Sequence, residues 1–94
     1  MEKVVKVKKE FSSKLSAVTH FDNSARLQTV NKQENPDFYK ILSEFEKLTN
    51  FPILLNTSFN MNGEPVVNNP NDAISTFLKC KLKTMIIGDF LIKK

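Results

Sequence analysis

The sequence predicts an α/β fold in which two main helices pack on one mixed, twisted β-sheet. Two segments begin with an Asn-Pro pair and continue with apolar residues at helical spacing, one from Asn35 and one from Asn69. Residues 52–57 form a continuous apolar run, which is typical of a strand covered on both faces. With 94 residues, 40% of them hydrophobic, residues 1–94 are expected to form a single domain whose one core uses most of the Phe, Ile, Leu and Val side chains.

The first third of the chain predicts short strands. Residues 1–15 are rich in lysine and alternate only partly, so we expect a lysine-blunted edge strand or a partly ordered arm. Residues 16–21 and 25–30 are β-prone runs separated by the turn-forming cluster of residues 22–24. They predict either a two-stranded hairpin or two strands joined by a functional loop.

The middle of the chain predicts a helix followed by a central strand. Asn35 supplies an N-cap oxygen and Pro36 needs no hydrogen-bond partner at the first helical position, so a helix is expected over residues 36–49. Its apolar stripe consists of Phe38, Ile41, Leu42, Phe45 and Leu48. If the strands at 25–30 and 53–57 are parallel neighbours, they and this helix form a right-handed crossover.

The last third predicts a second helix and a hairpin. Asn69 and Pro70 repeat the helix-start chemistry, which predicts a helix over residues 70–81. Residues 85–87 and 90–92 are β-prone, and the Gly-Asp pair between them is a turn former.

The composition excludes several classes of site. A net charge of +4 permits binding to polyanions but does not require it. One Cys and one His exclude an internal disulfide framework and a Cys/His zinc site, so we expect no metal bound by this chain alone. No apolar run approaches the about 20 residues of a membrane span, and the first residues lack the apolar stretch of a signal peptide. A cytoplasmic location is therefore expected.

Polar side chains at the ends of the predicted strands offer donors suited to phosphate or carboxylate oxygens. They lie in two segments: Ser24, Arg26 and Thr29, then Asn56, Thr57, Ser58 and Asn60. The residues alone leave open whether these segments bind a ligand or only build turns.

Arg26, His20 and Cys80 have two or more interpretations each. Arg26, the sole arginine, either reaches solvent, pairs with Asp22 or Glu64, or binds a phosphate or carboxyl oxygen. His20 is either a general acid or base or a hydrogen-bonded strand residue. Cys80 is either a reactive thiolate beside lysines or a small apolar side chain.

Five separated motifs resemble, in order and spacing, the C-terminal region of the NodU/CmcH-type O-carbamoyltransferase family. They are residues 20–30, 35–39, 52–60, 63–67 and 69–73. The chain departs from the family pattern at Asn23-Ser24, where the family has Gly-Thr, at Asn50, where it has Gly, and at Asn69, where it has Thr. Ser24 keeps a hydroxyl, and Asn visits left-handed conformations.

The resemblance implies a two-part enzyme. In that family an N-terminal domain transfers a carbamoyl group to an acceptor hydroxyl, and a C-terminal YrdC-like domain forms carbamoyl-adenylate from ATP, normally with Mg²⁺, and carbamoyl phosphate. This chain is similar to the latter part of that YrdC-like domain, a C-terminal carbamoyltransferase fragment. The transfer domain and its metal ion are expected in the same or a companion chain. The earlier half of the YrdC-like domain, with its own basic nucleotide contacts, is also expected outside these residues, so the 94 residues alone are expected to be weakly active or inactive.

The same resemblance implies roles for particular residues. Ser58 and Asn60 are expected to contact the carbamoyl or phosphate group, and Arg26 the phosphates, which makes these three the candidate catalytic residues. Nucleotide or substrate contacts are expected from Ser24, Arg26, Thr29, Asn56, Thr57, Ser58 and Asn60.

A second function class is a small basic module that binds RNA or another polyanion without catalysis. The excess of lysine favours it. Most aromatic residues lie on the predicted core stripes, which leaves few platforms for base stacking.

Overall fold

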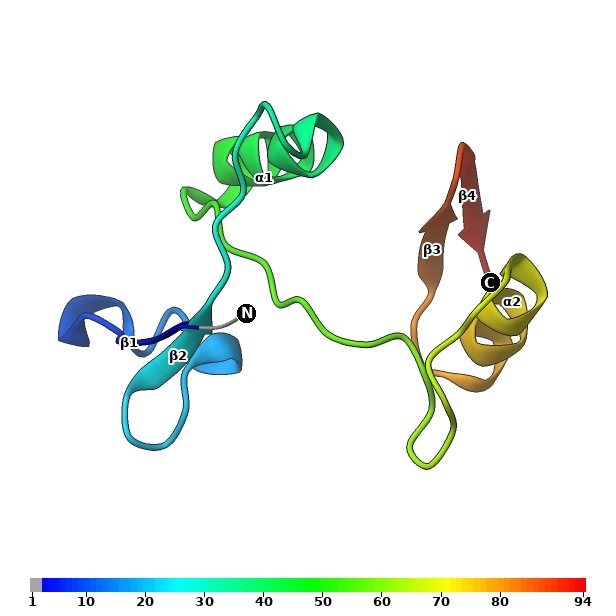
Figure 1. The fold of residues 1–94 in the computed structure, drawn as a ribbon, viewed down its shortest axis with the longest axis horizontal. Coiled ribbons are helices and arrows are strands. Elements are labelled where there is room, and N and C mark those ends of the chain that lie inside the picture. Colours follow the sequence, from blue (N-terminus) through cyan, green and yellow to red (C-terminus); the bar gives the residue numbers. More distant parts are fainter. Residues whose placement is uncertain (1–2) are drawn as a thin grey trace. The chain divides into compact units, whose positions relative to one another are not determined.

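The computed structural model describes residues 3–94, and the chain divides into two compact units, Met1–Leu55 and Asn56–Lys94 (Figure 1). The first unit contains, in order, β1 (Lys3–Lys6), the 3-10 helices Lys9–Phe11 and Ser16–Val18, β2 (Ser24–Leu27) and α1 (Pro36–Thr49). The second contains α2 (Pro70–Lys79), β3 (Thr84–Ile87) and β4 (Phe90–Lys93). Helices and strands thus both occur, and the predicted α/β class is confirmed.

The lysine-rich start of the chain forms β1, which pairs antiparallel with β2. The register runs from Lys3 opposite Leu27 to Lys6 opposite Ser24. Residues 16–18 adopt a 3-10 turn, so the predicted strand at 16–21 is wrong. Local hydrogen bonds form this turn instead: the Val18 N–H donates to the Leu15 carbonyl at 3.0 Å and the Thr19 N–H to the Ser16 carbonyl at 3.4 Å. The partner of β2 is β1, and Val7 N–H extends their ladder by donating to the Asn23 carbonyl at 2.8 Å.

Helix α1 has the predicted bounds because its two ends are capped. The Asn35 Oδ1 accepts the Phe38 N–H at 3.2 Å, with Pro36 at the first helical position. At the other end Asn50 adopts a left-handed conformation, φ 63°, and its N–H donates to the Glu46 carbonyl at 2.7 Å. Asn tolerates that conformation better than other non-glycine residues, which explains where the helix ends.

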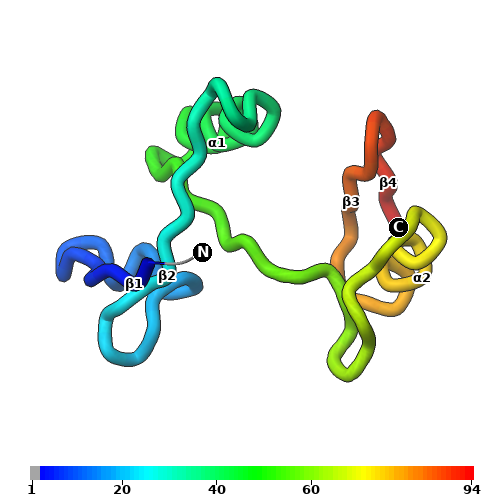
Figure 2. Tube along the Cα trace, viewed as in Figure 1, coloured from blue at the N-terminus to red at the C-terminus, as the bar shows by residue number. Residues whose placement is uncertain are grey.

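The predicted central strand is wrong, and with it the single mixed sheet and the right-handed crossover. Residues 51–59 contain no helix or strand, and the tube in Figure 2 follows this segment as an extended path. Within residues 3–94 the sheets are two antiparallel pairs, β1 with β2 and β3 with β4. A strand buried on both faces needs neighbours at both edges, and no described strand pairs with residues 53–57. Ile53 and Leu55 are accordingly exposed.

In the second unit, α2 and the following hairpin form as predicted, with α2 two residues shorter. The Asn69 Oδ1 accepts the Asp72 N–H at 2.9 Å and begins α2. The Cys80 N–H donates to the Thr76 carbonyl at 3.0 Å and ends it. Between β3 and β4 the chain turns through Gly88, whose φ of 56° suits a residue without a Cβ.

The buried apolar side chains of the described residues lie on α2. Phe77 is fully buried and Ala73 nearly so, with Thr76 beside them. Lys94 closes this cluster: its Nζ donates to the carbonyls of Phe77 and Cys80 and lies 4.6 Å from the centroid of the Phe77 ring. A positive charge is favourable at the carbonyl end of a helix. We expected the core to use most of the eight Phe side chains. Among the described residues, Phe77 is the buried one, so the core is smaller than expected.

No helix among residues 3–94 has the length and apolar character that a membrane crossing requires.

Replacing Phe77 by Ala should lower the free energy of unfolding of the second unit by about 3 kcal/mol or more, because it leaves a cavity beneath α2. Urea unfolding followed by circular dichroism measures this. Leu78→Ala is the control, since Leu78 is 65% exposed on the same helix and its truncation should cost about 0.5 kcal/mol. Equal losses in the two variants would show that Phe77 is not the core residue.

Candidate functional site

Residues 20–24 form a tight turn, here called the Asp22 turn, that leads into β2. The Ser24 hydroxyl donates to Asp22 Oδ1 at 2.6 Å, and the Ser24 N–H donates to the same oxygen at 3.0 Å. The His20 N–H donates to the Ser24 carbonyl at 2.7 Å, and Lys6 Nζ donates to the Asp22 carbonyl at 3.0 Å. Ser24 is buried by these contacts, so the turn fixes the start of β2.

Hydrogen bonding keeps Asp22 charged. The Ser24 hydroxyl, and after it the Ser24 N–H, hold the pKa of Asp22 below its ordinary value, and the Lys6 charge adds to this. Because the folded-state pKa is lowered, the contribution of the turn to stability is present above the unfolded pKa of about 3.9 and is lost as the pH falls through the folded pKa. The turn is therefore fully formed at neutral pH.

Arg26 is exposed on β2, opposite Val4. Ser24 and Arg26 are two positions apart on one strand and so share a face. Asp22 and Glu64 were the predicted ion-pair partners of Arg26. Within residues 3–94 Arg26 pairs with neither, and Glu64 forms its salt bridge with Lys79 at 3.3 Å. The exposed Arg26 thus lies, without a carboxylate partner among the described residues, on a strand whose start is fixed. Thr29 is exposed beyond the end of that strand.

In the second unit, residues 59–67 form a closed loop, here called the Asn60 loop. The Val67 N–H donates to the Phe59 carbonyl at 3.1 Å and closes it. Inside, Asn60 Nδ2 donates to the Glu64 carbonyl at 2.8 Å and to the Met61 carbonyl at 3.3 Å. Gly63 permits the sharp reversal with φ 83°. The Asn60 side chain thus holds together the loop that carries it.

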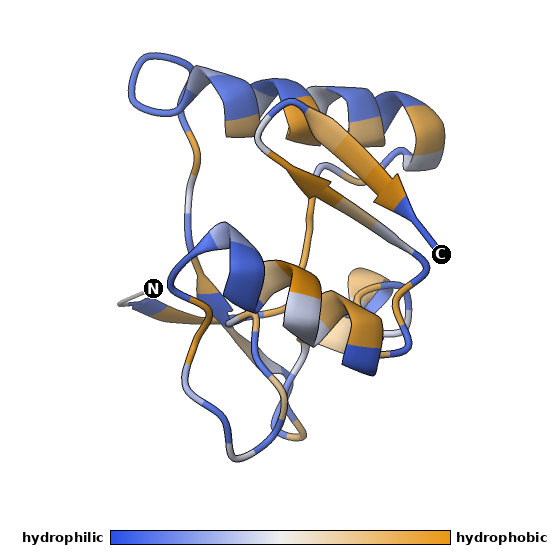
Figure 3. Ribbon diagram, turned by 90° about the vertical axis from the view of Figure 1, so that its right-hand side faces the viewer, coloured by the Kyte–Doolittle hydropathy of each residue, from blue (hydrophilic) through white to orange (hydrophobic). Residues whose placement is uncertain are grey.

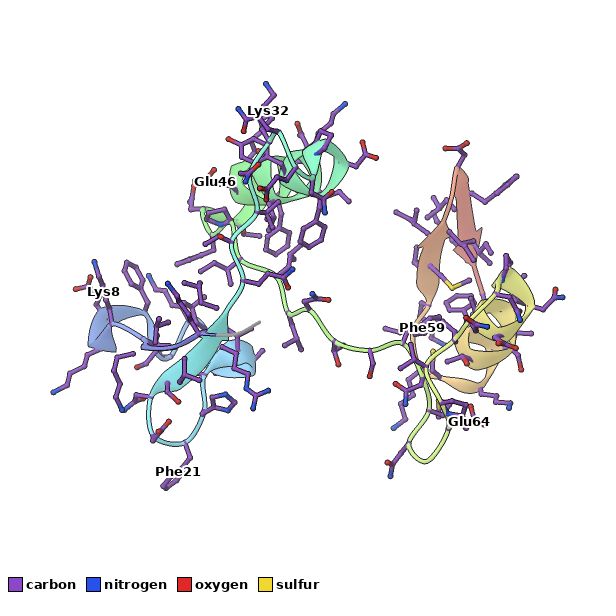
Figure 4. The ribbon with its side chains drawn as sticks, in the orientation of Figure 1. Lys8, Phe21, Lys32, Glu46, Phe59 and Glu64 are labelled. Carbon is purple, nitrogen blue, oxygen red and sulfur yellow. The ribbon has the colours of Figure 1, made fainter. Side chains whose placement is uncertain are left out.

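The Asn60 loop is joined to α2 by a salt bridge. Glu64 pairs with Lys79 across 3.3 Å, and Figure 4 shows Phe59 and Glu64 on the loop beside α2. Both charged side chains are about half exposed, so the pair adds little stability. Asn56, Thr57 and Ser58 are exposed in the segment just before the loop.

The structure brings the predicted site residues together in two groups. Ser24 and Arg26 share one strand of the first unit. In the second unit, Asn60 lies in the Asn60 loop and Ser58 lies just before it. That the two groups converge on one ligand stays a prediction. No group of three or more His, Cys, Asp or Glu side chains with metal-binding geometry occurs within residues 3–94.

The sequence predicted a turn at residues 22–24 but not which side chain holds it, nor that Phe21 lies in it. Asp22 organises the turn by accepting the backbone N–H of Ser24, two residues on, as in an Asx turn, and the Ser24 hydroxyl adds a second bond to the same oxygen. Phe21, expected in a strand, lies in the turn with its ring fully exposed and pointing away from it (Figure 4).

Ser24→Ala should raise the pKa of Asp22 toward 3.9, the ordinary value for Asp, because the strongest hydrogen bond to the carboxylate is removed. A carboxyl-detected NMR titration measures the shift. Ser13→Ala, which changes an exposed serine of the same unit, should leave it unaltered. An unchanged Asp22 pKa in Ser24→Ala would contradict the role of that hydroxyl.

Asn60→Ala should open the Asn60 loop, because two backbone carbonyls lose their side-chain donor. A net loss of about 1 kcal/mol corresponds to roughly fivefold faster hydrogen exchange at the Val67 amide. Asn62→Ala, at an exposed position of the same loop, serves as the matched control. Equal exchange rates in the two variants would show that Asn60 does not hold the loop closed.

Comparison with known proteins places the chain in a family. The family model for the carbamoyltransferase C-terminus matches residues 1–94. The chain is 47% identical over 94 residues to nodulation protein NolO of Bradyrhizobium diazoefficiens, of which it covers 17%. It is also 47% identical over 94 residues to nodulation protein NolNO of Sinorhizobium fredii, of which it covers 14%.

Another relative carries an enzyme name. The chain is 41% identical over 78 residues, 83% of its length, to the 3'-hydroxymethylcephem-O-carbamoyltransferase of Amycolatopsis lactamdurans, of which it covers 15%. The chain thus spans about a sixth of the length of these curated relatives. Its match to the C-terminal family model over the whole length and its identity to these proteins show that the chain belongs to the carbamoyltransferases, a family of transferases.

Proposed function

We propose that this chain contributes part of the ATP and carbamoyl-phosphate site of an O-carbamoyltransferase, where carbamoyl-adenylate is formed for transfer to an acceptor hydroxyl. The observation that carries the proposal is Arg26, an exposed guanidinium without a carboxylate partner within residues 3–94, on a strand whose start is fixed by the Asp22 turn. Relatives that are named O-carbamoyltransferases support the reaction class.

The chemistry requires donors more than a nucleophile. ATP and carbamoyl phosphate are both polyanions, and their conversion to carbamoyl-adenylate takes up one water and releases phosphate and pyrophosphate. Alignment and charge neutralisation lower the barrier of such a reaction. A planar guanidinium binds two phosphate oxygens at once, which a lysine ammonium does not do. Arg26 is the residue of this chain suited to that task.

The Asn60 loop supplies the second set of contacts in this proposal. The Nδ2 of Asn60 is engaged with the Glu64 and Met61 carbonyls, so Oδ1 is the atom left to accept a hydrogen bond from the carbamoyl amine. Ser58, exposed two residues earlier, would donate its hydroxyl to a carbamoyl or phosphate oxygen.

The remaining candidates have supporting roles in the proposal. Ser24 acts through the Asp22 turn and positions Arg26, because its hydroxyl donates to Asp22. Thr29, Asn56 and Thr57 are exposed side chains that would add polar contacts to the nucleotide.

The proposal includes Mg²⁺ as part of the nucleotide substrate. The donors described above suit phosphate oxygens, and carboxylates that could hold the ion do not cluster within residues 3–94. The ion would therefore be bound through the phosphates of ATP, whose charge it neutralises.

The proposed partner is the N-terminal carbamoyl-transfer domain, in the same or a companion chain. This chain covers 17% of NolO, and the matching family model describes a C-terminus. Recognition of the acceptor hydroxyl and the transfer step are assigned to that domain. The YrdC-like character of the C-terminal domain is part of the same proposal.

Arg26→Lys should slow carbamoyl-adenylate formation about tenfold to a hundredfold in the enzyme assembled with its N-terminal part, because the charge remains but the bidentate contact is lost. Pyrophosphate release in the presence of ATP, Mg²⁺ and carbamoyl phosphate measures the rate, and thermal unfolding is recorded in parallel. Lys32→Ala, at an exposed lysine of the same unit, should leave the rate unchanged.

Two outcomes would contradict this assignment. Unchanged rates in both Arg26→Lys and Arg26→Ala would remove Arg26 from the site. Early unfolding of both variants, with a proportionate loss of rate, would make Arg26 a structural residue instead.

A further inference from the structure

Helix α1 carries an apolar face that its own unit covers only in part: Phe38, Leu42 and Phe45 are half-buried, whereas Ile41 and Leu48 are exposed. No residue of this helix is buried, although it is strongly amphipathic. Ile41 is 54% exposed and Leu48 is 85% exposed. Figure 3 shows apolar residues along one side of α1 and polar residues along the other. This apolar face consists of Phe38, Ile41, Leu42, Phe45 and Leu48.

The packing of the described elements explains why part of the face is open. Within residues 3–94 the extensive contacts between elements are those of β1 with β2 and of β3 with β4, and α1 takes part in neither. A shallow groove runs along the helix, with an apolar floor and a charged rim. It is lined by Asp37, Lys40, Ile41, Glu44, Phe45 and Leu48.

Such a helix needs a covering surface. A helix of 14 residues is marginally stable in water without tertiary packing of its apolar side. The caps at Asn35 and Asn50 fix where α1 begins and ends, but each contributes only about 1 kcal/mol. The salt bridge between Glu44 and Lys47, 2.7 Å long, is exposed on the rim and therefore contributes little.

We infer that the apolar face of α1 docks on the polypeptide that precedes this segment in full-length carbamoyltransferases. The inference rests on the part of the proposed function that assigns an N-terminal partner. Its support is the length of chain outside this segment: the chain covers 17% of NolO and 15% of the cephem O-carbamoyltransferase, and the family model describes a C-terminus. The occupant is an apolar surface of that preceding polypeptide, rimmed by polar groups.

The area of the face favours a tethered occupant over a second copy of the chain. A helix of 14 residues is about 21 Å long, and a stripe roughly 10 Å wide along it covers about 200 Å². A stable interface between separate molecules buries about 800 Å² on each partner. A surface in the same polypeptide benefits from a high effective concentration and needs no such area.

The test uses two proteins: the 94-residue chain and a chimera in which it replaces the matching C-terminal segment of NolO. Hydrogen exchange of the α1 amides is measured in both, without ATP or carbamoyl phosphate. The amides should exchange about tenfold or more slowly in the chimera than in the isolated chain, since the docked helix opens less often. Ile41→Asp should abolish that difference, because a charge would face an apolar surface.

Matched variants separate loss of docking from loss of the helix. Ser43→Asp introduces the same charge two residues away, on the face opposite the apolar stripe, and should keep the slow exchange of the chimera. Leu48→Ala, which removes contact area while retaining a good helix former, should reduce the protection partly. Circular dichroism of the isolated variants reports their helix content.

Three results would overturn the inference. Equal exchange in the chimera and the isolated chain would show that the preceding polypeptide leaves α1 uncovered. Protection in the isolated chain that Ile41→Asp removes would show that this chain covers its own helix, and protection that rises with concentration would point to a second copy. Because no nucleotide is present, slow exchange in the chimera stands even if the Arg26 variants contradict the proposed function.

Discussion

Asn35, Asn69 and Asp22 each use a side-chain oxygen to accept a backbone N–H at the start of an element, at 3.2, 2.9 and 3.0 Å. The described residues bury one large side chain completely, that of Phe77. Because apolar burial is so limited, the described structure depends on such short-range hydrogen bonds. A cap satisfies donors that a helix start would otherwise leave unpaired. Local hydrogen bonding therefore places the elements, while apolar packing among the described residues is confined to the surroundings of α2.

Local hydrogen bonds also organise the candidate site. Ser24 and Asn60 direct their donors into their own turns, toward Asp22 and Glu64. Arg26 and Ser58 remain exposed next to these fixed turns. A rigid turn beside an exposed donor suits anion binding, since the donor is held near its position before the ligand arrives. In the proposed function, Ser24 thus becomes a positioning group for Arg26, while Asn60 holds its own loop through Nδ2 and keeps Oδ1 for the ligand.

The open part of the α1 face and the incomplete nucleotide site are connected in our proposals. Domains bury apolar faces against another layer, and Ile41 and Leu48 are exposed within residues 3–94. Relatives such as NolO are about six times as long. Docking on the preceding polypeptide would cover this helix and would also complete a nucleotide site of which the chain holds a part.

The sequence by itself determined both helices, the hairpin around Gly88 and the family, because caps, turn residues and motif order are local patterns. It also indicated Arg26 as the sole guanidinium. Tertiary structure decided that β2 pairs with β1 and that residues 53–57 form no strand. It likewise decided that Ser24 and Asn60 bond within their own turns. Strand pairing and side-chain partners depend on residues distant in the chain or on exact turn geometry, which the pattern of apolar and polar residues does not encode.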